Sequence, residues 1–79
     1  MSDYTKVTLK YNDNARFPCR TCIELKYNGK YYRCEAEGPD FQASWAAALR
    51  VMVNKTGLPE WMVREYLDLA DIQMPFEDL

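Results

Sequence analysis

The sequence predicts a small α+β fold: a three-stranded antiparallel sheet packed on one face by helices, in the order β-β-β-α-α. Three observations lead to this prediction. Residues 4–11 and 20–37 show the two-residue alternation of strands, Asn28-Gly29 is a strong hairpin turn, and residues 41–55 carry apolar side chains at helical spacing. The chain of 79 residues has the length of a single domain, residues 1–79. We expect the sheet over 4–37, a helical part over 40–70 and an acidic, mobile tail over 71–79.

The first strand is predicted over residues 4–11, YTKVTLKY, because its apolar and polar side chains alternate. Asn12-Asp13-Asn14 ends it, since short Asx side chains bond their own backbone and favour turns. One face of this strand carries Val7, Leu9 and Tyr11, and the other carries Tyr4, Lys6, Thr8 and Lys10.

The second and third strands form a hairpin whose register follows from its two-residue turn. With Tyr27 opposite Lys30, the pairs continue to Arg20 opposite Glu37. This register collects apolar side chains on one face and places two opposite-charge pairs on the other. The apolar set is Ile23, Leu25, Tyr32, Cys34 and Ala36, and the charged pairs are Glu24 with Arg33 and Arg20 with Glu37.

Two helices follow the hairpin. Asp40 is the predicted N-cap of a helix over 41–55, and Gly57 is its stop signal. Pro59 suits the first turn of a second helix over 59–70. The apolar stripe of the first helix is Phe41, Trp45, Ala48, Leu49 and Met52, and that of the second is Met62, Tyr66 and Leu69.

The composition argues against an enzyme. The chain has no histidine, which excludes Ser-His and Cys-His nucleophile pairs and every imidazole metal site. The CxxC spacing of Cys19 and Cys22 occurs in zinc and redox sites, but here it runs into a strand and not into a helix start that would lower a thiol pKa. Cys34 falls on the opposite face from Cys22. We therefore expect free, reduced thiols and no metal or other cofactor, with a zinc site or a disulfide as the alternative.

Charge is divided unevenly along the chain. Residues 1–34 carry seven Lys and Arg against three Asp and Glu, a net +4, and residues 35–79 carry three against nine, a net −6. The two halves are electrostatic opposites within an overall charge of −2. No run approaches the roughly 18 apolar residues of a membrane span, and the first residues lack the apolar core of a signal peptide. We expect a cytoplasmic protein without membrane contact.

Two charged surfaces are candidates for binding. The outward sheet face offers cations that suit phosphates and rings that suit stacked bases. An acidic protein surface would satisfy the same groups. An acidic strip near the C-terminus would mimic phosphates and occupy a basic groove on another protein. In each case the simpler alternative is a solvated surface without a partner. The sheet face comprises Tyr4, Lys6, Lys10, Arg20, Lys26, Tyr31 and Arg33, and the acidic strip comprises Glu60, Glu65, Asp68 and Asp71.

Residues 23–53 resemble the hairpin-plus-helix half of a double-stranded RNA-binding domain. YNGKYYRCEAEG is similar to the hairpin of that family, and ASWAAAL is similar to its Ala-rich second helix. The family, however, begins with a helix that contacts RNA and places lysines at the start of the second helix, where this chain has Pro39-Asp40-Phe41-Gln42. The resemblance implies a β-β-β-α order and carries over no RNA-binding residue.

These observations rank a non-catalytic protein-binding or inhibitory protein first, acting by occupying the surface of a protein partner. In size and charge the chain is similar to small acidic inhibitors encoded by phages and mobile elements, including anti-CRISPR proteins, an analogy of type without a shared motif. The alternative is a nucleic-acid-binding module that uses the sheet face. Homodimerisation through the oppositely charged surfaces is a further expectation.

Overall fold

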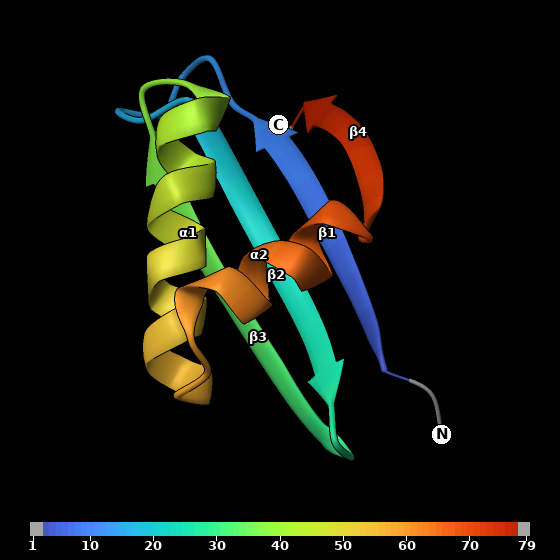
Figure 1. Cartoon of the computed structure of the whole chain (residues 1–79). Helices are drawn as coiled ribbons and strands as arrows, with labels where there is room; N and C mark the ends of the chain where they lie inside the picture. The colour runs from blue at the N-terminus through green and yellow to red at the C-terminus, as the bar shows by residue number, and fades with distance from the viewer. Residues whose placement is uncertain (1–2, 78–79) are drawn as a thin grey trace.

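The computed structural model describes the backbone of residues 3–77, and the side chains of residues 3–70 and 72. The three predicted strands are β1 (Tyr4–Tyr11), β2 (Cys19–Tyr27) and β3 (Lys30–Gly38), and they pair antiparallel. The predicted helices are α1 (Phe41–Thr56) and α2 (Glu60–Asp68). Both helices lie on one face of the sheet, with α1 along β3 and β2 and α2 crossing β2 and β1 (Figure 1). The predicted α+β fold is confirmed.

The hairpin register agrees with the prediction at every position, from Tyr27 opposite Lys30 to Arg20 opposite Glu37. Asn28 and Gly29 both have positive φ, 52° and 79°, which is the geometry that a two-residue hairpin turn requires. Period-two alternation and turn chemistry thus point to the same pairing.

Helix α1 has both predicted caps. The Asp40 carboxylate accepts a hydrogen bond from the Ala43 N–H at 2.7 Å, which satisfies one of the free donors of the first turn. Gly57 takes φ 73°, and its N–H donates to Val53 O at 2.9 Å. At the other end, a Cβ on Gly38 would lie only 2.7 Å from Ser44 N, so the helix start approaches β3 where only glycine fits.

The expectation of a tail over 71–79 is corrected for residues 71–77, and residues 78–79 lie outside the described residues. Asp71–Glu77 forms β4, which pairs parallel with β1, so the sheet order is β3-β2-β1-β4. The register shifts between Thr8 and Lys10, opposite the part of β4 that contains Pro75. A proline lacks the N–H of a ladder hydrogen bond and is tolerated in an edge strand such as this one. In Figure 1, β4 lies beside β1 at the edge opposite β3.

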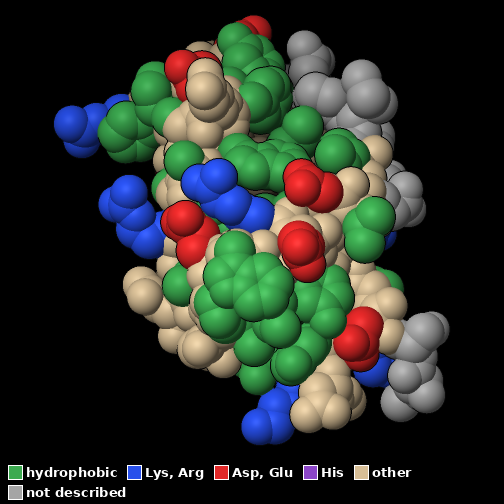
Figure 2. Space-filling view, in the orientation of Figure 1, with side chains coloured by type: hydrophobic (Ala, Val, Ile, Leu, Met, Phe, Trp, Pro, Cys, Tyr) green, Lys and Arg blue, Asp and Glu red, His purple; other side chains and the backbone are tan. Residues whose placement is uncertain are grey.

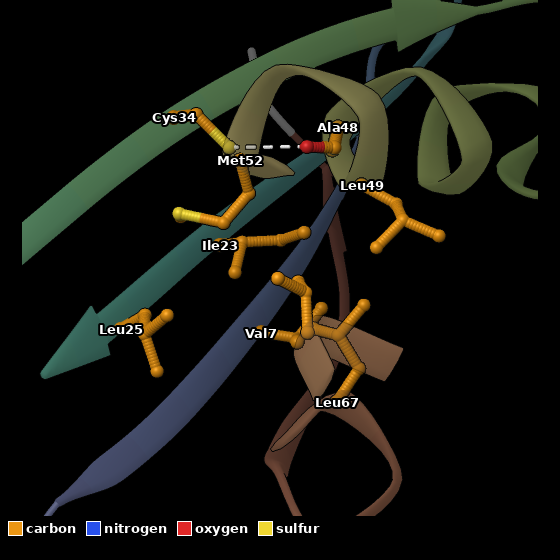
Figure 3. Close-up of a cluster of buried hydrophobic side chains, with 9 residues drawn as sticks. Val7, Ile23, Leu25, Cys34, Ala48, Leu49, Met52 and Leu67 are labelled. Atoms are coloured by element: carbon orange, nitrogen blue, oxygen red, sulfur yellow. Dashed lines mark hydrogen bonds between the residues drawn. The ribbon is translucent and has the colours of Figure 1, made fainter. Parts of the chain in front are cut away.

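The core lies between the sheet and the two helices (Figure 3). Inward side chains of β1, β2 and β3 meet α1 and α2 there, and the Cys34 thiol donates to Ala48 O at 3.4 Å. No helix of the described residues is long and apolar enough to cross a membrane. The buried cluster comprises Val7, Ile23, Leu25, Cys34, Ala48, Leu49, Met52, Val63 and Leu67.

The predicted inner stripe of α2, Met62, Tyr66 and Leu69, is not the stripe that the helix buries. Val63 and Leu67 are the buried residues of this helix, whereas Leu69 is 87% exposed. The predicted helix over 59–70 is shorter in the structure, and Leu69 is the residue that follows its last turn. Met62 and Tyr66 are half-buried, and Tyr66 packs against the core.

Candidate functional site: two opposed surfaces

The outward sheet face forms a grid of cross-strand rows. One row aligns Tyr4, Lys26 and Tyr31, with the lysine on β2 between two tyrosines on its neighbours. The two rings are 46% and 53% exposed. The structure thus brings the predicted aromatic residues of this face into one row, where a flat apolar group would meet two rings beside a cation.

The next rows of the sheet face combine cations with carboxylates. Arg33 Nη2 lies 2.8 Å from Glu35 Oε1, and its Nε lies 3.8 Å from Glu24 Oε1. Arg20 Nη2 lies 3.1 Å from Glu37 Oε1. The two predicted charge pairs of the hairpin are therefore confirmed, and the Arg33–Glu35 pair is an addition. These carboxylates neutralise part of the positive charge that the sequence places here.

Lysines extend the sheet face toward the loop between β1 and β2. Lys6 lies opposite Glu24, and Lys10 lies opposite Arg20. At the loop, Phe17 is exposed and the Arg16 guanidinium lies 5.7 Å from its ring centroid. The sheet face therefore ends in a basic and aromatic corner that sequence reasoning did not assign to it.

The opposite surface, the helix face, is formed by the exposed side of α2 and the adjacent side of α1. Glu60, Glu65 and Asp68 are all exposed on it, as predicted for an acidic strip. The backbone of Asp71 belongs to β4 and pairs with Lys6, and its side chain lies outside the described residues. Arg64 also lies on this surface and pairs with Glu60 at 3.5 Å, so the strip carries less negative charge than the sequence suggests.

The helix face also carries exposed apolar side chains. Trp61 is 60% exposed, and Leu69 is 87% exposed, with Glu65 between them at helical spacing. Sequence reasoning missed both. The signal for Trp61 was present, because it falls on the helical arc of Glu65 and Asp68 and not on that of Val63 and Leu67.

A groove of about 340 Å³ lies between α1 and α2. Apolar side chains of both helices line it, and Arg64 and Asp68 stand at its α2 side. Figure 2 shows this side of the molecule, where hydrophobic side chains gather over the helices with acidic side chains among them. The lining residues are Gln42, Trp45, Ala46, Leu49, Arg64, Leu67 and Asp68.

The three cysteines do not converge. Cys22 is buried on the outward face of β2, whereas Cys19 and Cys34 point to the helix side, as the register predicted. All three are free thiols, and burial raises the pKa of each above its ordinary value. A neutral, buried thiol is a poor nucleophile and a poor metal ligand. Among the described residues, no group of three or more Cys, Asp or Glu side chains is arranged to hold a metal ion.

The two surfaces offer exposed rings, ion pairs and, on the helix face, an apolar groove. No model of a known protein family, no curated protein and no solved structure matches this chain. The resemblance to a double-stranded RNA-binding domain thus stays a prediction.

Proposed function

We propose that this protein is a non-catalytic binding protein that acts by covering a surface of a protein partner with its helix face. The observation that carries this proposal is the exposed Trp61, 60% open to solvent beside the carboxylates of Glu60 and Glu65. Large exposed aromatic residues are enriched among those that dominate protein interfaces. An indole that the fold leaves in water costs solvation free energy unless a partner covers it.

The chemistry of the helix face indicates which kind of partner surface would complement it. The groove between α1 and α2 accepts an apolar side chain against Trp45, Leu49 and Leu67, while Glu65 and Asp68 stand beside it. A complementary surface combines an apolar anchor with Lys or Arg side chains around it. Coverage of a functional site on such a partner would make the protein an inhibitor, in line with the phage-encoded proteins that it is similar to in size and charge.

Affinity capture from cells that naturally produce the protein tests this proposal, with variants of both faces compared side by side. We expect the wild type and a sheet-face control, Lys10→Glu, to retain one stoichiometric protein partner. Trp61→Ala should weaken that complex by at least about ten-fold, the loss expected of an interface anchor, and Glu65→Lys should weaken it as well by repelling basic groups. Binding that Lys10→Glu abolishes and Trp61→Ala leaves intact would contradict the assignment to the helix face.

The second candidate function is binding of single-stranded nucleic acid on the sheet face. The row of Tyr4, Lys26 and Tyr31 favours it, because two exposed rings beside a cation suit stacked bases and a phosphate. If it holds, the protein should bind an oligonucleotide with a salt dependence of roughly −0.7 per phosphate contact on a log-log scale. Lys6→Glu and Lys26→Glu should then abolish binding, whereas Trp61→Ala should leave it unchanged.

A further inference from the structure

The outer edge of β3 presents backbone groups in a regular pattern. β3 lies at one end of the sheet and pairs with β2 along its whole length. Because the two-residue turn makes Tyr27 and Lys30 a hydrogen-bonded pair, alternate residues from Lys30 onward direct N–H and C=O toward β2. The residues between them direct these groups away from the sheet: Tyr31, Arg33, Glu35 and Glu37.

A contact from α1 agrees with this assignment. Lys55 Nζ donates a hydrogen bond to Arg33 O at 2.6 Å, so the Arg33 carbonyl does point to the open side of β3. The same contact places the Lys55 side of α1 beside that edge. Lysines near an edge strand are one of the devices by which proteins limit uncontrolled strand pairing. Lys55 therefore restricts which strands fit this edge, and a partner strand has to match the side chains beside it.

We infer that this edge pairs antiparallel with the same edge of a second copy, which gives a symmetric homodimer with one continuous sheet. The side chains select the register. With Cys34 on the two-fold axis, Arg33 of each copy lies opposite Glu35 of the other, and Tyr31 lies opposite Glu37. Both are pairs of residues whose backbone groups point outward, so each pair can exchange two hydrogen bonds. The Arg33 carbonyl uses its second lone pair for this bond, beside the one that it accepts from Lys55 Nζ.

Neighbouring registers of the same hydrogen-bonding type are disfavoured by charge. A shift in one direction places Arg33 opposite Arg33 on the axis and leaves no opposite-charge pair. A shift in the other direction places Glu35 opposite Glu35 on the axis, flanked by two Arg33–Glu37 pairs. Like charges directly opposite each other destabilise a strand pair, and opposite charges stabilise it. Among these registers, only the one with Cys34 on the axis combines two opposite-charge pairs with no like-charge pair, which gives the self-complementarity that a symmetric interface requires.

Helix α1 contributes an apolar strip beside the same edge. Ala47 and Val51 precede Lys55 at intervals of four residues and so lie on its side of the helix. Val51 is 36% exposed. The Cys34 thiol donates a hydrogen bond to Ala48 O. Ala47, the neighbour of Ala48, therefore lies at the level of Cys34, through which the proposed axis passes. Small side chains there let the α1 helices of the two copies approach closely. The groove between α1 and α2 lies on the other side of α1. The dimer therefore leaves the helix face open.

Complementary charge reversals test this interface. Arg33→Glu makes positions 33 and 35 both acidic, and Glu35→Arg makes them both basic. By sedimentation velocity with a reductant present, we expect the wild type to dimerise with increasing concentration. Each variant alone should dimerise at least about ten-fold more weakly, because both symmetric pairs become like-charged. An equimolar mixture of the two variants should restore a dimer, and native mass spectrometry should identify it as the heterodimer.

Two control variants distinguish the β3 edge from the remaining surfaces of the protein. Lys6→Glu changes a charge on β1, away from the proposed interface, and should dimerise like the wild type. The double variant Arg33→Glu/Glu35→Arg keeps the local ion pair and the self-complementarity, and should also dimerise. A wild type that stays monomeric, single variants that dimerise like the wild type, or a mixture that stays monomeric would each overturn the proposal.

Discussion

At the scale of single residues, a buried polar pair joins the sheet to α1. Thr21 on β2 and Ser44 on α1 are fully buried, and their hydroxyl oxygens lie 2.7 Å apart. The Ser44 hydroxyl also donates to Phe41 O at 3.0 Å, so Thr21 is the donor of the bond between the two side chains. This pair sits where Gly38 admits the start of the helix, and it fixes the position of α1 on the strand beneath it.

The two residues should therefore be energetically coupled. Ser44→Ala leaves the buried Thr21 hydroxyl without this partner and should lower the free energy of unfolding by about 1–3 kcal/mol. Thr21→Val in the Ser44→Ala background removes the orphaned hydroxyl and should recover part of that loss. Urea denaturation of the wild type, both single variants and the double variant measures the coupling. Strictly additive losses would show that the bond carries no such role.

At the scale of elements, the periodicity of α2 does not by itself determine which face of the helix is buried. Apolar residues occur almost all round this short helix, and helical periodicity permits either Met62, Tyr66 and Leu69 or Val63 and Leu67 as the inner stripe. Packing against the sheet and α1 selects Val63 and Leu67. The helix then ends before Leu69, which leaves that side chain in solvent.

Two leucines of this segment should accordingly differ in their contribution to stability. Leu67→Ala creates a cavity in the core and should cost about 2–5 kcal/mol. Leu69→Ala, a matched change two residues later, should alter the free energy of unfolding by no more than about 0.5 kcal/mol. Urea denaturation measures both changes, and the two are compared provided that the variants have the same m-value. Losses of similar size for the two variants would contradict the packing of α2.

The fourth strand is the element that the sequence did not reveal. Residues 71–79 are short and acidic and contain a proline, features that favour a tail. In the fold, β1 would otherwise present its outer edge to solvent, and Asp71–Glu77 pairs with that edge. Strand formation here follows from an available partner edge and not from local propensity.

At the scale of the whole molecule, three buried thiols on both faces of the sheet link stability to pH. Desolvation raises the pKa of Cys19, Cys22 and Cys34 in the folded chain, whereas unfolded thiols ionise near about 8.5. The folded state therefore binds these protons more tightly than the unfolded state does. Their contribution to stability is complete below about pH 8.5. It is lost as the pH rises through the higher pKa values of the folded state.

The free energy of unfolding should thus fall as the pH is raised from about 7 to about 9.5, in the window where unfolded thiols deprotonate. Urea denaturation at a series of pH values, with a reductant present, measures this slope. Cys34→Ala removes one of the three thiols and should make the slope shallower, independently of any loss of stability at neutral pH. A stability that is constant over this range would contradict the protonated, buried state of the thiols.

The sequence by itself determined the antiparallel hairpin, its register, the caps of α1 and the separation of Cys22 from Cys34. These features depend on neighbours close in the chain. They follow from the two-residue alternation of strands, from a turn that needs positive φ and from caps that bond within a few residues. It also identified the residues of the sheet face, since the same alternation assigns them. Only the tertiary structure decided the features that depend on distant partners. β4 exists because β1 offers an edge, the backbone of Asp71 belongs to that strand and not to α2, and Trp61 is exposed because the core covers the opposite side of α2. Such outcomes follow from competition among surfaces brought together by the fold, and no local window of sequence contains that competition.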